Sequence, residues 1–141
     1  MPITFQVEEI KFVLVQKTNI RKWIQHILKL ENKILGEVNY IFTSDEKVYK
    51  TNFKYLKHDT YTDIITFDYC EKNIVNSDII ISIERIEENA KKLKINFNEE
   101  LRRVIIHGIL HLCGYKDKTK KAAEIMRRKE NWALELYAKI I

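Results

Sequence analysis

Residues 107–117 read HGILHLCGYKD, a run that predicts both the central helix of the fold and its chemistry. His107 and His111 are four residues apart, a spacing that places both imidazoles on one face of an α-helix. Two histidines arranged in this way can bind the same metal ion. Gly114 favours a helix end, because glycine adopts the left-handed conformation at this position without steric cost. The run therefore predicts a helix that carries a histidine pair and ends in a tight turn.

Asp117 follows this turn six residues after His111, so its carboxylate can supply a third ligand. Three protein ligands leave a tetrahedral ion with one open position for water, whereas structural zinc sites are closed by four ligands. The alternative is a histidine pair that binds no metal. Residues 104–110 are almost wholly apolar and predict a buried helix, in which an unpartnered imidazole costs roughly 1–3 kcal/mol. We therefore expect one divalent ion per chain, Zn²⁺ in the first place, with other divalent metals as alternatives.

The composition fits one globular domain over residues 1–141. No apolar run reaches the ~18 residues that span a bilayer, and residues 1–12 lack the pattern of a signal peptide. A cytoplasmic protein with no membrane partner is expected. In that compartment Cys70 and Cys113 are expected to be reduced thiols rather than a disulfide.

The net charge of +5 and the pI near 9.1 permit a polyanionic partner such as RNA. Basic side chains near the expected site are the candidates for RNA contacts. They are Lys54, Lys57, Arg102 and Arg103. The simpler interpretation of the lysines is a solvated helix face.

β-branched and alternating segments predict four strands, and segments with a 3.6-residue apolar period predict helices between and after them. The expected strands are residues 3–7, 37–43, 63–69 and 77–83, the last two as an antiparallel pair. The expected helices are residues 19–32, 45–55 and 82–93, the histidine helix that ends at Gly114, and a last helix from Thr119. The fold class is α+β, a small mixed sheet covered by helices with the metal-binding helix at its centre.

Helix ends are expected where side chains can satisfy free backbone groups. Thr18 and Asn98 are the expected N-caps of two helices, and either Ser44 or Asp45 caps a third, because short polar side chains accept a bond from the first turn. Gly36 is expected to stop the first helix.

Three further segments join the histidine run in one resemblance. They are residues 52–67 (NFKYLKHDTYTDIITF), 77–82 (SDIIIS) and 126–130 (MRRKE). Together with residues 107–117 they resemble the YbeY family, whose patterns are H-G-x-L-H-L-x-G-Y-D-H, N-x-x-Y-R-x-x-D-x-x-T-D-V-L-S-F and G-D-I-x-I-S. The resemblance covers most of the chain from about residue 37 onward.

The resemblance implies a metal-dependent, single-strand-specific endoribonuclease. Its implied roles are late maturation of the 3′ end of small-subunit rRNA and ribosome quality control, with rRNA and the small ribosomal subunit as partners. The implied ligands are His107, His111 and Asp117. The implied fold is a small, mostly parallel mixed sheet with helices packed against it.

The sequence departs from the family pattern at two positions. Asp117 stands where the family usually has a third histidine, and a carboxylate still binds Zn²⁺. Leu56 stands where the family usually has an arginine beside its cleft, so one phosphate contact is expected to be missing. Weak metal-dependent cleavage that increases on Leu56→Arg is therefore expected.

Two other functions remain open from the residues. A metzincin-like protease needs a glutamate after the first histidine, where this chain has Gly108. A non-enzymatic ribosome- or RNA-binding factor would use the metal to stiffen its fold. His58, Asp59 and Asp63 are candidates for the proton acceptor of a hydrolase, although a turn or capping role is the simpler interpretation of each.

Overall fold

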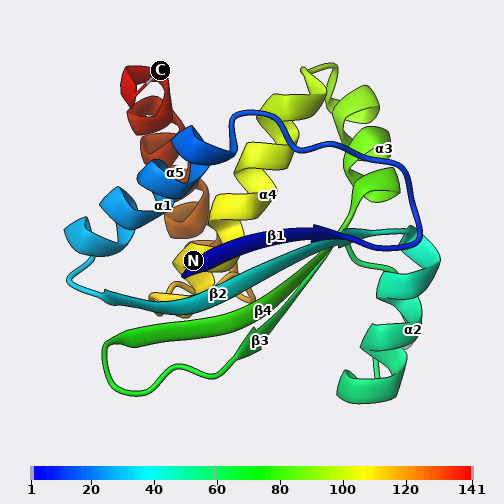
Figure 1. The fold of residues 1–141 in the computed structure, drawn as a ribbon, viewed down its shortest axis with the longest axis horizontal. Coiled ribbons are helices and arrows are strands. Elements are labelled where there is room, and N and C mark those ends of the chain that lie inside the picture. The colour runs from blue at the N-terminus through cyan, green and yellow to red at the C-terminus, as the bar shows by residue number, and fades with distance from the viewer. Residues whose placement is uncertain (1, 59, 141) are drawn as a thin grey trace.

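The computed structural model describes residues 2–58 and 60–140. Four strands form one sheet in the order β1-β2-β4-β3 (Figure 1). The strands are β1 (Ile3–Val7), β2 (Ile34–Thr43), β3 (Ile64–Asp68) and β4 (Ile74–Ser82). Strands β1, β2 and β4 are parallel and β3 runs antiparallel to β4, so the expected mixed α+β fold is confirmed.

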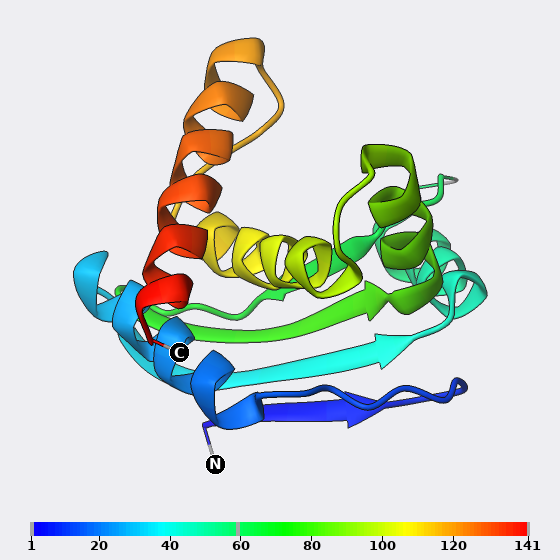
Figure 2. The same ribbon diagram turned by 90° about the horizontal axis from the view of Figure 1, so that it is seen from above.

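Five helices accompany the sheet in the described part of the chain. They are α1 (Lys17–Leu30), α2 (Asp45–Leu56), α3 (Ile83–Leu93), α4 (Phe97–Leu112) and α5 (Lys120–Ile140). Figure 2 shows α1, α4 and α5 on the same side of the sheet. None of the described helices is long and apolar enough to cross a membrane.

The core lies between this helix layer and one face of the sheet. Val38, Tyr40 and Phe42 alternate along β2 toward the helices and are fully buried, as the two-residue period of a strand requires. The expected apolar stripe of α1 is buried against them; its members are Ile20, Trp23, Ile24, Ile27 and Leu28. Trp23 Nε1 also donates a 2.7 Å hydrogen bond to the carbonyl of Ala133, which joins α1 to α5.

Helix α4 is the central helix that the sequence predicts. Its buried residues lie on nearly every side, because α3, α5 and the sheet all pack against it. Tyr40 Oη donates to the Ile105 carbonyl at 3.0 Å and fixes α4 on the sheet. A Cβ at Gly108 would lie 3.1 Å from Ile64 Cδ1 and 3.3 Å from Ile79 Cδ1, so glycine allows α4 to approach β3 and β4 closely.

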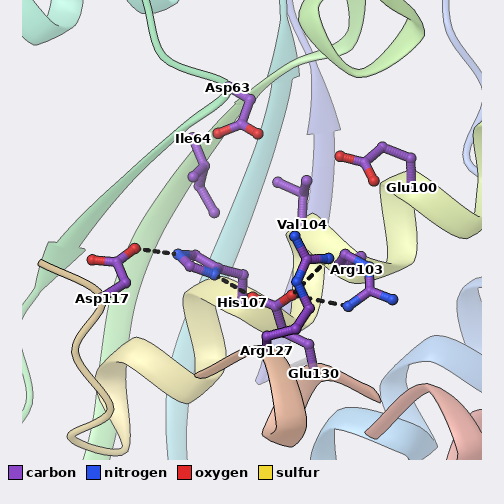
Figure 3. A pocket seen from close by; sticks show the side chains of 9 residues that line it. All are labelled: Asp63, Ile64, Glu100, Arg103, Val104, His107, Asp117, Arg127 and Glu130. Carbon is purple, nitrogen blue, oxygen red and sulfur yellow. Dashed lines mark hydrogen bonds and ion pairs between the residues drawn. The ribbon is translucent and has the colours of Figure 1, made fainter. Parts of the chain in front are cut away.

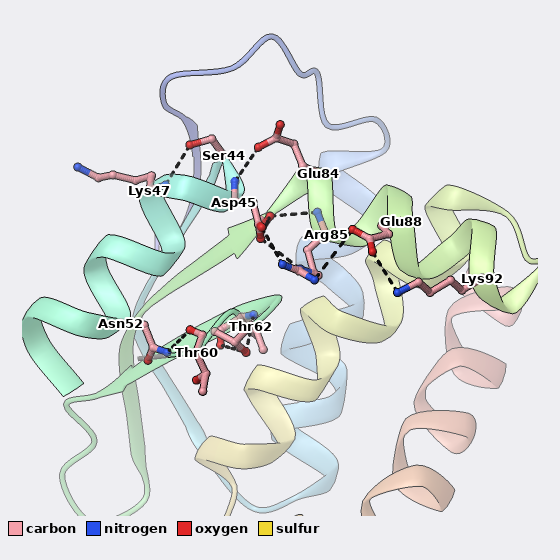
Figure 4. Close-up of polar contacts among 12 residues, drawn as sticks. Ser44, Asp45, Lys47, Asn52, Thr60, Thr62, Glu84, Arg85, Glu88 and Lys92 are labelled. Atoms are coloured by element: carbon pink, nitrogen blue, oxygen red, sulfur yellow. Dashed lines mark hydrogen bonds and ion pairs between the residues drawn. The ribbon is translucent and has the colours of Figure 1, made fainter. Parts of the chain in front are cut away.

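Helices α2 and α3 are tied together beyond the ends of the central strands (Figure 4). Ser44 accepts a bond from the Lys47 amide and caps α2 as predicted, and Ser82 caps α3 in the same way. Asp45 pairs with Arg85 at 2.7 Å across the two helices. The connection from α2 to β3 is held by Asn52, whose amide donates to a backbone carbonyl at Thr60.

Three predicted helix ends are wrong. Thr18 lies inside α1, which begins after Gln16, and the N-cap of α4 is Asn96 rather than Asn98. Gly36 does not end a helix; it lies in β2 at an irregularity of the pairing with β4. There the Asn76 side chain accepts a 2.8 Å hydrogen bond from the backbone beside it, and a Cβ at Gly36 would collide with Asn76.

Candidate metal centre

A cleft of about 250 Å³ runs along the side of α4 that faces β3 and α5 (Figure 3). Its lining combines acidic, basic and apolar side chains from four parts of the chain. They are Asp63, Ile64, Glu100, Arg103, Val104, His107, Asp117, Arg127 and Glu130. His107 and Asp117, two of the three predicted ligands, therefore meet in one cleft.

His107 is anchored by a carboxylate from the last helix. Its Nδ1 lies 2.7 Å from Glu130 Oε2, and Glu130 is only 6% exposed. The other carboxylate oxygen of Glu130 accepts a 3.0 Å bond from Arg103, and Arg127 lies 3.8 Å from it. A metal-binding histidine is commonly oriented in this way, with one ring nitrogen held by a carboxylate and the other left for the metal.

The pKa values of this pair move in opposite directions. Burial favours the neutral form of Glu130, but hydrogen bonds from His107 and Arg103 outweigh it and hold the pKa below its ordinary value. Burial likewise opposes the charged form of His107, but the bond to Glu130 and the charges of Glu130 and Asp117 raise its pKa. Protonation of His107 therefore competes with the binding of a metal ion by this imidazole.

His111 is oriented by the backbone of the turn after α4. Its Nδ1 lies 2.7 Å from the carbonyl oxygen of Tyr115. A carbonyl only accepts hydrogen bonds, so Nδ1 carries the proton and donates it. Nε2 then carries the lone pair that a metal requires.

The turn that supplies this carbonyl is itself held in place. Gly114 has a φ of 106°, the left-handed conformation expected of it, and its amide donates to the carbonyl of His111. Tyr115 Oη donates to Glu31 at the end of α1, and Lys129 of α5 pairs with the same carboxylate at 2.8 Å. The orientation of His111 thus depends on α1 and α5.

Asp117 Oδ2 lies 3.3 Å from Nε2 of His107, and the rings of His107 and His111 are 5.6 Å apart between centroids. Among residues 2–58 and 60–140, no three His, Cys, Asp or Glu side chains already surround a common point as metal ligands. The donor set nevertheless suits Zn²⁺, because both imidazoles have their Nδ1 engaged and a carboxylate lies beside one Nε2.

The cysteine beside the site does not belong to it. Cys113 and Cys70 are free thiols, as predicted. Burial is the main cause that raises the pKa of Cys113 to about 12, so its thiol stays protonated and is a poor metal ligand.

The four candidates for RNA contacts lie in different places. Arg103 lines the cleft, whereas the guanidinium of Arg102 lies 4.6 Å from the ring centre of Tyr137. Lys54 and Lys57 are exposed at the end of α2 and do not line the cleft. The structure therefore brings one of the four beside the predicted ligands.

The segment between α2 and β3 contributes one predicted residue to the cleft. Asp63 lines it, His58 is exposed and does not, and Asp59 lies outside the described residues. Leu56 is the last residue of α2, is 39% exposed and does not line the cleft.

Sequence reasoning missed Glu130, Glu100 and Arg127 as cleft residues. Glu130 could have been found, because it lies four residues after Met126 and three before Ala133, on the buried stripe of α5. A carboxylate on such a stripe needs a partner, and His107 supplies it. Glu100 and Arg127 carry no comparable signal in the sequence.

The comparisons with known proteins agree with this architecture. A family model described as Endoribonuclease YbeY matches residues 3–138. A protein named Endoribonuclease YbeY from Christiangramia forsetii is 50% identical over 126 residues, which are 89% of this chain and 88% of the relative. Its namesake from Bacteroides fragilis is 48% identical over 136 residues, 96% of this chain and 98% of the relative.

The fold is also similar to the solution structure of TM1509 from Thermotoga maritima. The two share 28% identity with a TM-score of 0.65, over 97% of this chain and 92% of the other. Family model, full-length relatives and fold all lead to the same assignment. The chain belongs to the YbeY family.

Proposed function

We propose that this protein is a metal-dependent endoribonuclease that cleaves single-stranded RNA. The relatives that it matches over nearly their full length carry the name Endoribonuclease. The observation that supports this chemistry is the way in which hydrogen bonds orient the two histidines. Each has its Nδ1 engaged, one by Glu130 and one by the Tyr115 carbonyl, which leaves Nε2 of each for a metal.

We further propose His107, His111 and Asp117 as the ligands of one Zn²⁺ ion. When bound, the ion would polarise a phosphoryl oxygen and lower the pKa of a water molecule that attacks phosphorus. The protein residues orient that chemistry, because Glu130 and the Tyr115 carbonyl fix the two imidazoles. Arg103 and Arg127 line the same cleft and can attract the phosphate of the substrate.

Asp63 is our candidate for the proton acceptor. It lines the cleft on the strand side, across from α4 (Figure 3). Burial is the main cause that raises its pKa above the ordinary value, ahead of the opposing charge of His107. A carboxylate with a raised pKa is a stronger base and accepts a proton from the attacking water more readily.

The biological setting proposed here follows from the family. The substrate would be rRNA, with late processing of the 3′ end of small-subunit rRNA as the reaction and the small ribosomal subunit as the partner. Cytoplasmic location and a role in ribosome quality control belong to the same proposal.

One experiment tests metal and activity together. Purified protein should carry close to one divalent ion per chain by elemental analysis, and it should cleave single-stranded RNA faster than structured RNA. A chelator should abolish cleavage and added Zn²⁺ should restore it. The double variant His107→Ala, His111→Ala should lose both the ion and the activity.

Two outcomes would contradict the proposal. Full metal occupancy in the double variant would exclude these histidines as ligands. RNA binding without any metal-dependent cleavage by the loaded parent protein would instead identify a non-enzymatic RNA-binding factor.

A further inference from the structure

Glu100 is the anomaly of the cleft. It lies in the first turn of α4, is 5% exposed and lines the same cleft as His107. Its Oε1 is the one buried side-chain nitrogen or oxygen that lacks a hydrogen-bond partner within residues 2–58 and 60–140. Buried polar atoms are almost always satisfied, so an exception directed into a cleft calls for a partner from outside the protein chain.

The nearby cations approach Glu130 rather than Glu100. Arg103 bonds to Glu130 at 3.0 Å and to the Asn131 side chain, and Arg127 approaches the same Glu130 oxygen at 3.8 Å. Figure 3 shows the Glu100 carboxylate directed into the cleft, at the opposite end from Asp117. Burial, followed by the charge of Asp63, raises the pKa of Glu100, while Arg103 and Arg127 act in the other direction.

The chemistry of this end of the cleft selects the kind of ligand. A carboxylate oxygen repels phosphate and accepts hydrogen bonds. Four carboxylates line the cleft, but Arg103 and Arg127 already offset part of the Glu100 charge, so a second cation is not required there and Mg²⁺ is one outcome of the test below. A neutral donor remains, and RNA supplies two: the ribose 2′-hydroxyl and the amino or imino groups of its bases.

We infer that Glu100 determines specificity, with its Oε1 accepting a hydrogen bond from a neutral donor of a nucleotide bound in the cleft. The inference rests on the proposed function, since it takes RNA as the substrate. Glu100 selects the nucleotide and does not touch the reacting phosphate. The fold keeps an unsatisfied acceptor there because the substrate, when bound, satisfies it.

The test uses the zinc-loaded protein with Glu100→Leu, which removes the acceptor at similar size, and Glu100→Gln, which keeps a carbonyl oxygen. Glu99→Leu is the matched control, because Glu99 is exposed in the same turn. Fluorescence anisotropy measures the affinity for a short single-stranded RNA. Melting temperature and metal content are measured on the same samples.

Glu100→Leu should weaken RNA binding on the order of 10- to 100-fold, the range of a hydrogen bond to a charged group. Glu100→Gln should lose less RNA affinity, and Glu99→Leu should lose almost none. Metal content should be unchanged, and the melting temperature should stay equal or rise because an unsatisfied buried carboxylate is gone. A purely structural Glu100 would give a lower melting temperature with parental RNA affinity, which would overturn the inference.

Substituted oligonucleotides identify the donor. One set replaces single riboses by 2′-deoxyribose, and a second replaces guanosine by inosine or adenosine by purine riboside. The parent protein should bind one of these two sets more weakly than the unmodified RNA. Glu100→Leu should bind that set and the unmodified RNA with the same affinity. The inference would be overturned if parent and variant lost equal affinity for the modified RNA. It would also be overturned if the zinc-loaded parent bound Mg²⁺ and Glu100→Gln abolished that binding. Because binding is read without cleavage, a protein that binds RNA but fails to cut it contradicts the proposed function alone.

Discussion

The two ends of the cleft-facing side of α4 differ in how their polar atoms are satisfied. At the His107 end, Nδ1 of His107 contacts Glu130, and Glu130 pairs with Arg103. Nε2 of His107 lies 3.3 Å from Asp117. At the other end, Glu100 is as buried as Glu130, yet one of its carboxylate oxygens has no hydrogen-bond partner in the described part of the chain. The first end is organised before any ligand arrives, whereas the second depends on a ligand to complete it.

Each end of this side of α4 therefore suits a different kind of ligand. Preorganised donors suit a resident ion, because the cost of orienting the ligands is met during folding. An unsatisfied acceptor suits a transient substrate, because each binding event regains the missing hydrogen bond. Three variants or conditions test this contrast, in order of decreasing effect.

The largest effect is expected from Glu130→Gln, which keeps the size of the side chain and removes its charge. Metal affinity should fall roughly 10- to 100-fold, the usual range for the partner of a metal-binding histidine. Competition with a chromogenic chelator measures this affinity. Glu135→Gln is the control, because Glu135 is exposed on the same helix. Parental affinity in Glu130→Gln would show that the His107 end is not preorganised by its carboxylate.

Acid should release the ion from the His107 end. Histidine binds a metal only when the coordinating nitrogen is deprotonated, so protons compete with the ion as the pH falls. The pKa of His107 is raised in the metal-free protein, so competition begins nearer neutrality than for an unperturbed histidine. We expect the ion to be lost as the pH falls through roughly 6 to 5. Elemental analysis after gel filtration measures this loss. An ion retained unchanged at pH 4 would exclude His107 and His111 as its ligands.

The smallest effect is expected from Leu56→Arg. Leu56 is 39% exposed at the end of α2, so an arginine is tolerated there and the melting temperature should hardly change. If the long side chain reaches the cleft, cleavage should rise by up to about tenfold, equivalent to about 1.4 kcal/mol. A folded, metal-loaded variant with the parental rate would show that the cleft needs no clamp from this position.

The sequence predicted what local periodicity and capping determine. The buried stripe of α1 and the Gly114 turn follow from apolar spacing and from glycine's access to positive φ. The α4 cap was misplaced by two residues because both Asn96 and Asn98 have suitable side chains. Phe97 is already the first residue of the helix and packs against Phe12 from there, so the cap is Asn96.

Contacts between distant segments could not be predicted. Gly36 resembles a helix stop in the sequence, since nothing in its own segment shows that Asn76 of β4 approaches it. The anchor of His107 lies on α5, where the apolar stripe marks Glu130 as buried but does not show which distant residue is its partner. The histidine run was therefore visible in the sequence, whereas the residues that orient it required the tertiary structure.

The contact between His107 and Glu130 also determines when the site can be completed during synthesis. Residues 107–117 leave the ribosome before α5, so a nascent chain contains the three proposed ligands before it contains Glu130. Lys129, which helps to hold the turn behind His111, emerges at the same late stage. In a ribonuclease built in this way, the two histidines are therefore not yet oriented while most of the chain has already emerged beside the rRNA of the ribosome that makes it.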